Sequence, residues 1–223
     1  MAAEGGLHRV ENTLAAGAPP KDAKAAVILV HGRGATPESM LPLAEGFGRD
    51  DIHYLAPRAT QNTWYPNSFL APIEINEPWL SSALSLLGAL VDRLAADGFS
   101  ADRVGIIGFS QGACLTSEFI ARNARRYGMA GVLTGGLIGP PGTPRDYAGS
   151  LGGTPIFLGS SDIDPHVPLE RIKETTKVLS KLGAEVDERI YPRMGHTVND
   201  DEVKAVKELM EGMIAGEPAP YLP

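Results

Sequence analysis

Residues 108–112, with the sequence GFSQG, contain the strongest chemical signal in the chain. The pentapeptide follows an apolar run at 104–108 and opens a helical pattern. On a sharp turn from a strand into a helix, a serine hydroxyl projects out of the sheet, and glycines two residues before and after it avoid collisions with neighbouring backbone. Ser110 is therefore a candidate nucleophile for attack on a carbonyl carbon. An ordinary turn between a strand and a helix is the alternative interpretation.

A serine hydroxyl is a weak nucleophile at neutral pH and needs a base in contact with it. Chains with this type of turn place an acid, and then a histidine, after later strands. His196 follows the apolar segment 186–191 and is the candidate base, although it could instead cap the helix that follows. Asp162 and Asp164 both follow the segment 155–158, and spacing alone does not choose between them.

A metal site is an alternative use of the same aspartates. Asp162, Asp164 and His166 are close together in the sequence, and carboxylate and imidazole groups bind many metal ions. No other histidine or carboxylate pair completes a coordination shell. We therefore expect neither a metal nor an organic cofactor.

A tetrahedral intermediate would need N–H donors for its negatively charged oxygen. The sequence HGRG at 31–34 follows an apolar run at 27–30, where a second donor is expected. We predict that the backbone amides of Arg33 and Gln111 are this pair. For His31 we predict a structural role, in which its side chain holds the loop through a hydrogen bond. Cys114 is predicted to be a small core residue.

The segment 57–77 is long for a connection without clear periodicity, and such connections are uncommon unless they have a function. It leaves the carboxyl end of a predicted strand, which is where open α/β sheets bind ligands. Trp64 and Tyr65 are predicted to form a wall of the substrate pocket. Alternatively these aromatic residues, with Phe69, only attach the loop to the body of the protein.

Short apolar runs alternate with longer helical patterns, which predicts a mainly parallel sheet with helices on both faces. Asn76 or Glu77 is expected to cap the second helix, with Pro78 near its first position. An antiparallel strand around 8–14 could be added at one edge. The predicted strands are 27–30, 52–56, 104–108, 132–134, 155–158 and 186–191, and the predicted helices lie near 38–48, 78–96, 111–126, 168–182 and 200–215.

The 223 residues fit one domain, 1–223, with a loosely held tail at 216–223. The segment 137–154 is too short and too rich in turn residues for a cap domain. With 20 Lys and Arg against 27 Asp and Glu, the formal charge is −7, and no basic stripe is present to bind nucleic acid.

A cytoplasmic location is expected. The single cysteine excludes an internal disulfide, and the first residues lack the pattern of a secretory signal. The longest uncharged stretch, 127–144, is crowded with glycine and proline, so we expect no membrane span.

Four segments together resemble the bacterial carboxylesterase/phospholipase family of α/β-hydrolases, a branch that also contains the acyl-protein thioesterases. They are HGRG at 31–34, GFSQGA at 108–113, DPHVP at 164–168 and MGHT at 194–197. The resemblance implies a single-domain α/β-hydrolase without a cap domain. Its acid lies in an Asp-Pro-x-Val-Pro pattern, which selects Asp164, so the implied catalytic residues are Ser110, Asp164 and His196.

The implied function is a serine carboxylesterase that hydrolyses small esters of short to medium chain length through an acyl-enzyme intermediate. Residues 58–77 depart from the thioesterase branch. The alternatives are an acyl thioesterase or lysophospholipase that uses the same residues, and a binding protein of the same fold with negligible turnover. The expected partner is a small ester, and a homodimer is one option for the oligomeric state.

Overall fold

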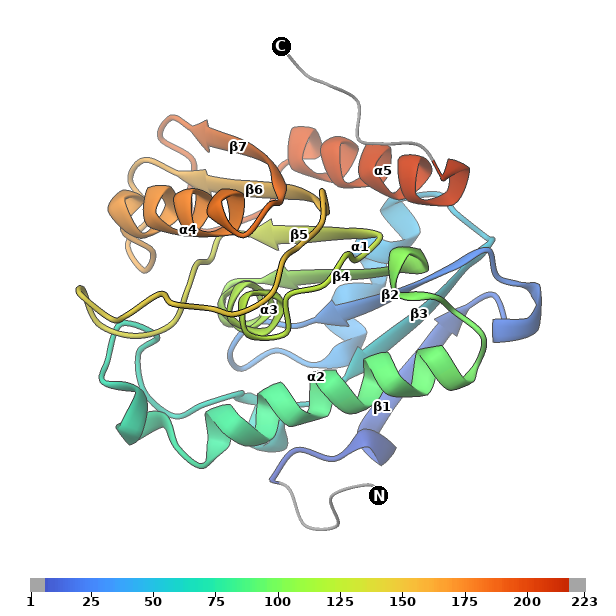
Figure 1. Cartoon of the computed structure of the whole chain (residues 1–223), viewed down its shortest axis with the longest axis horizontal. Helices are drawn as coiled ribbons and strands as arrows, with labels where there is room; N and C mark the ends of the chain where they lie inside the picture. The colour runs from blue at the N-terminus through green and yellow to red at the C-terminus, as the bar shows by residue number, and fades with distance from the viewer. Residues whose placement is uncertain (1–6, 217–223) are drawn as a thin grey trace.

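Seven strands form one sheet in the order β1-β3-β2-β4-β5-β6-β7 (Figure 1). The computed structural model describes residues 7–216, so the predicted tail lies, except for its first residue, outside the described part. Strand β1 pairs antiparallel with β3, and all other pairs are parallel. The strands are β1 (Thr13–Gly17), β2 (Ala25–Val30), β3 (Ile52–Pro57), β4 (Val104–Phe109), β5 (Met129–Leu133), β6 (Pro155–Ser161) and β7 (Glu185–Tyr191).

Within the described residues, five α-helices cover the two faces of this sheet (Figure 1). Helices α2 (Trp79–Ala96), α3 (Gln111–Arg122) and α4 (Leu169–Lys181) contribute to one hydrophobic cluster, whereas α1 (Leu41–Gly46) and α5 (Asp200–Ala215) contribute to a second one. Consecutive residues of a strand point to opposite faces. In β2, accordingly, Ile28 packs in the first cluster and Leu29 in the second. The expected single α/β domain with helices on both faces is confirmed.

The predicted edge strand exists, but it begins at Thr13 rather than near residue 8. The ring of His8 is used elsewhere: its Nε2 lies 3.0 Å from the carbonyl of Trp64, and its Nδ1 accepts a hydrogen bond from the Thr60 amide. Residues 10–12 then form a 3-10 turn. The start of the strand is therefore set by tertiary contacts, and these cannot be predicted from the local sequence pattern.

Two helix ends differ from the prediction for local reasons. Helix α1 is preceded by a 3-10 turn, because Pro42 in its first turn has no N–H and prevents an earlier start. Helix α3 ends early, where the Asn123 side chain donates to the carbonyl of Phe119. At the start of α2, the Glu77 carboxylate accepts hydrogen bonds from the amide and hydroxyl of Ser81, whereas Asn76 is buried and bonds to the long loop.

Helix α2 is long and apolar enough, by length and composition, to cross a membrane. Its buried residues include Leu80, Leu87 and Leu94, which belong to the first hydrophobic cluster of the domain. Burial against the sheet accounts for the apolar composition of this helix, so the composition is weak support for a membrane span.

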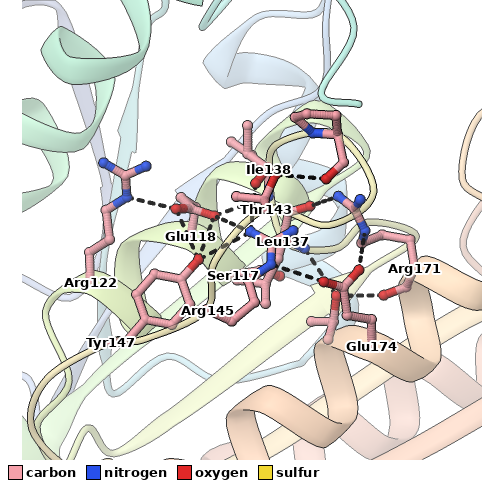
Figure 2. A network of polar contacts seen from close by, with 12 residues as sticks. Ser117, Glu118, Arg122, Leu137, Ile138, Thr143, Arg145, Tyr147, Arg171 and Glu174 are labelled. Atoms are coloured by element: carbon pink, nitrogen blue, oxygen red, sulfur yellow. Dashed lines mark hydrogen bonds and ion pairs between the residues drawn. The ribbon is translucent and has the colours of Figure 1, made fainter. Parts of the chain in front are cut away.

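The connection from β5 to β6 contains neither a helix nor a further strand of the sheet. A buried polar network attaches it to α3 and α4 (Figure 2). Glu118, which is 1% exposed, accepts hydrogen bonds from the Ile138 amide (3.0 Å), the Tyr147 hydroxyl (3.1 Å) and Arg122 Nε (2.6 Å). Arg171 of α4 donates to the carbonyl of Leu137. This segment is thereby held against the helices and forms no cap domain.

Candidate active site

Ser110 stands between β4 and α3 in a strained conformation, with φ 55° and ψ −118°. The two flanking glycines allow it. A Cβ on Gly108 would lie 2.2 Å from the carbonyl oxygen of Gly112, and a Cβ on Gly112 would lie 2.1 Å from the carbonyl oxygen of Val30. A side chain at 108 would therefore force the turn apart, and one at 112 would push the start of α3 away from β2. The sharp strand-to-helix turn expected from the sequence is present.

Ser110, His196 and Asp164 are connected by hydrogen bonds. Nε2 of His196 lies 2.8 Å from Oγ of Ser110, and Nδ1 of the same ring lies 2.7 Å from Oδ2 of Asp164. The serine follows β4, the aspartate follows β6 and the histidine follows β7, so the carboxyl ends of three parallel strands bring the residues together. This is the spatial arrangement of a nucleophile, its base and an acid that orients the base.

Asp164 is held on both oxygens. Oδ2 faces His196, and Oδ1 accepts hydrogen bonds from the amides of His166 (2.8 Å) and Val167 (2.9 Å). Burial acts to raise the pKa of Asp164, but these hydrogen bonds outweigh it and the pKa lies below its usual value. The carboxylate is therefore ionised at neutral pH and can stabilise positive charge on the imidazole.

Asp162, the competing carboxylate, bonds to the backbone, whereas the histidine bonds to Asp164. Its Oδ1 accepts a hydrogen bond from the Arg193 amide at 2.7 Å, which stabilises the turn after β7. Within the part of the chain that the structure describes, no group of three His, Cys, Asp or Glu side chains is arranged to hold a metal ion. Asp164 and His166 are near each other, but the oxygens of Asp164 face His196 and backbone amides.

The HGRG segment lies beside the serine. A Cβ on Gly32 would be 3.4 Å from Cβ of Ser110. Arg33 and Gln111 both line the cavity above Ser110, and within residues 7–216 no carbonyl accepts a hydrogen bond from either backbone amide. Both amides are thus available as donors to a ligand, which is the condition for the predicted oxyanion role.

His31 is fully buried and holds its own loop, as the sequence predicts. Its Nε2 accepts a hydrogen bond from the Ala59 amide at 3.1 Å, and its Nδ1 lies 2.7 Å from the carbonyl of Gly32. Because Nε2 accepts, the proton is on Nδ1 and the ring is neutral. Burial lowers the pKa of His31, in agreement with a neutral ring.

A cavity of about 540 Å³ opens above Ser110. One side is formed by the long loop, through the consecutive residues Tyr65, Pro66, Asn67, Ser68 and Phe69. Phe109, Cys114, His166 and Val167 add to its lining. The volume is within the usual range for small-molecule sites. The unusually long connection after β3 therefore has the position that the sequence predicted.

Tyr65 is part of this wall, but Trp64 is not. The indole of Trp64 is completely buried, its Nε1 donates to the carbonyl of His31 at 2.8 Å, and its ring packs against the ring of His31. The prediction that both residues form the pocket wall is therefore wrong for Trp64, because its side chain points into the protein and attaches the loop to the HGRG segment. The alternative interpretation applies to this residue.

Two side chains beside Ser110 have contacts that sequence reasoning missed. The side chain of Gln111 accepts a hydrogen bond from the Trp64 amide (3.0 Å) and donates one to the carbonyl of Tyr65 (2.8 Å). The guanidinium of Arg33 donates to the carbonyls of Pro66 and Asn67. The long loop is thus fixed by the side chains of the two residues whose backbone amides are the predicted oxyanion donors.

His166 is a further residue of the site that the sequence suggested only as a metal ligand. Its ring lies edge-on to the ring of His196, with centroids 4.9 Å apart, while Phe109 contacts the same ring at 5.4 Å. Together these two rings limit the orientations open to the imidazole of His196. The proximity of His166 to Asp164 in the sequence is the signal that could have identified it.

Comparison with known proteins shows the family and the fold of the chain. The family described as Phospholipase/Carboxylesterase matches residues 12–214. A phospholipase/carboxylesterase from Dyadobacter fermentans is 39% identical and has a TM-score of 0.87, over 95% of this chain and 100% of that one. Acyl-protein thioesterase 1 of Debaryomyces hansenii is 24% identical over 88% of this chain and 94% of its own length.

Carboxylesterase SOBER1 of Arabidopsis thaliana is 24% identical over 64% of this chain, and the match spans 62% of that protein's length. The crystal structure of SOBER1 has a TM-score of 0.72 at 21% identity, which shows the shared fold. The sheet order, the strained serine and a family match over nearly the whole described chain lead to one conclusion. The protein is a single-domain α/β-hydrolase that belongs to the phospholipase/carboxylesterase family.

Proposed function

We propose that this protein is a serine carboxylesterase that hydrolyses esters of short to medium chain length, with Ser110 as its nucleophile. The observation that carries the proposal is the continuous hydrogen-bonded path from Asp164 through His196 to Ser110 Oγ. The serine end of this path lies in the cavity. Family membership supports an ester hydrolase, because relatives are named carboxylesterases and thioesterases.

The reaction follows from the contacts. His196 Nε2 takes the proton of Ser110 as Oγ attacks the ester carbonyl, and ionised Asp164 stabilises the imidazolium that forms. The amides of Arg33 and Gln111 donate hydrogen bonds to the oxyanion. The intermediate then collapses, and His196 protonates the departing alcohol. Water repeats the same steps on the acyl-enzyme and releases the acid.

The cavity supports a small substrate. Its volume of about 540 Å³ has room for a short acyl chain with its alcohol, and the Tyr65–Phe69 wall bounds it on one side.

Since Cys114 is the only cysteine and lies buried in α3, the chain forms no internal disulfide, which favours a cytoplasmic location.

A thioesterase is the second candidate, and it is favoured by the relatives named acyl-protein thioesterase 1. Thioesters would react at the same serine, but a long acyl chain needs more room than a short one. The departure of residues 58–77 from the thioesterase branch therefore favours small esters. Rates on matched p-nitrophenyl esters, thioesters and a lysophospholipid, measured side by side, decide between the two.

Turnover of p-nitrophenyl acetate tests the proposal directly. We expect hydrolysis by the unmodified protein and a loss of roughly 10³-fold or more in kcat for Ser110→Ala, because the nucleophile and its base act as a unit. Circular dichroism of the variant should match that of the parent. Absence of turnover by the unmodified protein would favour a binding protein of the same fold, and a variant that keeps a tenth of the activity would exclude Ser110 as the nucleophile.

A further inference from the structure

The cavity above Ser110 has an unbalanced charge. Among the described residues that line it, Arg33 is cationic, His166 and His196 are the two histidines, and none is acidic. The chain as a whole has a formal charge of −7, so a basic surface does not explain this lining. The positive charge is instead a local property of the site.

The guanidinium of Arg33 is fixed in place without being neutralised. Nη1 donates to Thr63 Oγ1 (3.1 Å) and to the carbonyl of Pro66 (2.9 Å), and Nη2 donates to the carbonyl of Asn67 (2.6 Å). All three acceptors are uncharged. Among residues 7–216, no Asp or Glu forms an ion pair with Arg33.

Arg33 also lies over the ring of Tyr65, with its central carbon 5.9 Å from the ring centroid. This contact and the three hydrogen bonds hold the side chain at the wall of the cavity. A guanidinium carries more N–H donors than these three acceptors use, and its planar edge matches a carboxylate. Because its position is already fixed, little side-chain entropy is lost when an anion binds.

We propose that Arg33 selects esters that carry a second, ionised carboxylate, such as monoesters of dicarboxylic acids. This inference depends on the esterase function proposed above and adds a substrate class to it. The carboxylate would accept hydrogen bonds from the guanidinium while the ester carbonyl lies at Ser110. A neutral ester of the same length lacks this interaction, and a cationic ester is repelled.

Two pairs of esters test the proposal. Mono-4-nitrophenyl adipate and its terminal-amide analogue match in size and differ in charge on the acyl side. The pair 4-acetoxybenzoate and 4-acetoxybenzamide places the same difference on the alcohol side. For at least one pair, we expect kcat/KM to be roughly three- to tenfold higher for the anion, which is the usual range for a partly exposed charge-assisted contact. A ratio near one or below in both pairs overturns the proposal.

Three variants assign the effect to Arg33. In Arg33→Gln the ratio should fall to about one, whereas Arg33→Lys should keep most of it. Arg126→Gln is the matched control: Arg126 also donates to two backbone carbonyls, of Gly152 and Gly153, but it does not line the cavity. This control changes net charge equally and should keep the full ratio. The ratio of kcat/KM for the anionic ester to kcat/KM for its neutral analogue is measured within each variant. A general loss of activity therefore cancels in this ratio.

Salt and binding provide readouts that do not depend on the fold of the Arg33 variants. Raising ionic strength from about 20 to about 500 mM should lower the ratio in the unmodified protein, because salt screens exposed charges. In Ser110→Ala, the adipate monoester should bind more tightly than its amide analogue. Hydrolysis of p-nitrophenyl acetate without any charge preference would overturn this inference alone, whereas lack of hydrolysis would overturn the proposed function and leave the binding comparison as the test.

Discussion

The side-chain amide of Gln111 bridges Trp64 and Tyr65: its oxygen accepts a hydrogen bond from the Trp64 backbone amide, and its nitrogen donates one to the Tyr65 carbonyl. Gln111 is only 6% exposed. The residue next to the serine therefore serves two different parts of the site, the oxyanion position through its backbone and the cavity wall through its side chain. A displacement of the cavity wall would therefore also displace Gln111, the residue next to Ser110.

Gln111→Ala should uncouple these two roles, since it keeps the backbone amide and removes the side-chain hydrogen bonds to the long loop. The Trp64 amide would then lack a partner, which costs about 1–3 kcal/mol, whereas the Tyr65 carbonyl would keep its hydrogen bond from the Thr63 hydroxyl. We expect a lower melting temperature and weaker discrimination in kcat/KM between short and longer p-nitrophenyl esters. Gln111→Glu retains an acceptor for the Trp64 amide. Its melting temperature and its discrimination between esters should lie between those of the parent and of Gln111→Ala. An unchanged chain-length profile in the alanine variant would contradict the coupling.

Asp164→Asn should reduce kcat by roughly 10³-fold or more, because an amide can neither stabilise the imidazolium nor fix its tautomer. Asp162→Asn is the matched control on the same loop. Its side-chain oxygen can still accept the hydrogen bond from the Arg193 amide, so kcat should stay within a fewfold of the parent. Initial rates with p-nitrophenyl acetate measure both. If Asp162→Asn were the more damaging change, the acid would have been assigned to the wrong residue.

Trp64→Ala should affect stability, whereas Phe69→Ala should affect substrate preference. Removing the buried indole should cost about 3–5 kcal/mol of stability and lower activity on all esters alike. Phe69 lines the cavity, so its truncation should alter the preference among acyl chain lengths by about 1–3 kcal/mol. Thermal unfolding beside a series of four esters separates the two effects. If Trp64→Ala changed the preference among acyl chain lengths without lowering stability, Trp64 would have to be assigned to the pocket wall after all.

Glu202 makes stability depend on pH. It is completely buried, its Oε2 accepts from the Asn199 amide, and its Oε1 has no hydrogen-bond partner among the described residues. Burial raises the pKa of Glu202 to about 7. A raised pKa means that folding favours the protonated form, so stability is full below the unfolded-state pKa of about 4.3 and falls as pH rises towards 7.

Glu202→Gln should therefore stabilise the protein at pH 8 and have little effect at pH 4.5. The gain at pH 8 is about 4 kcal/mol, from the difference between a pKa of about 7 in the folded protein and about 4.3 in the unfolded chain, at about 1.4 kcal/mol per unit. Glutamine also preserves the hydrogen bond to Asn199 that begins α5. Urea unfolding at both pH values measures this difference. Equal effects at the two pH values would exclude ionisation of Glu202 as the cause.

Activity should not rise sharply when an ester exceeds its solubility limit. The connection from β5 to β6 is held by Glu118 and Arg171 and forms no cap over the cavity. Rates on a soluble ester measured across its solubility limit should follow a single saturation curve. A step at the limit would require a lid that opens at interfaces.

The parts of the site that the sequence predicted depend on local geometry. Gly108 is required by a collision within the turn and Gly112 by the backbone of the adjacent strand β2, and the GFSQG pattern identifies this strand-to-helix turn. Strand ends likewise place His196 and the aspartates at one edge of the sheet. The choice of Asp164 over Asp162 came from family resemblance, since two carboxylates with the same placement differ only in which one faces the histidine.

The remaining features depend on contacts between distant segments. Whether Trp64 faces the cavity or the core is decided by the carbonyl of His31, 33 residues earlier. The Gln111 side chain bonds to a loop 46 and 47 residues away. Aromatic composition and loop length predict that such a segment has a function, but they contain no information on which side chain points inward.

The chain separation between the reacting groups has a consequence for folding. Ser110 and His196 are 86 residues apart, and His196 follows β7, the strand at one edge of the sheet. Edge elements often open before the centre of a protein does. Detachment of β7 and α5 would carry the imidazole away from a serine that stays in place on the central strands. During refolding, the catalytic activity would accordingly return only once β7 has docked on the sheet.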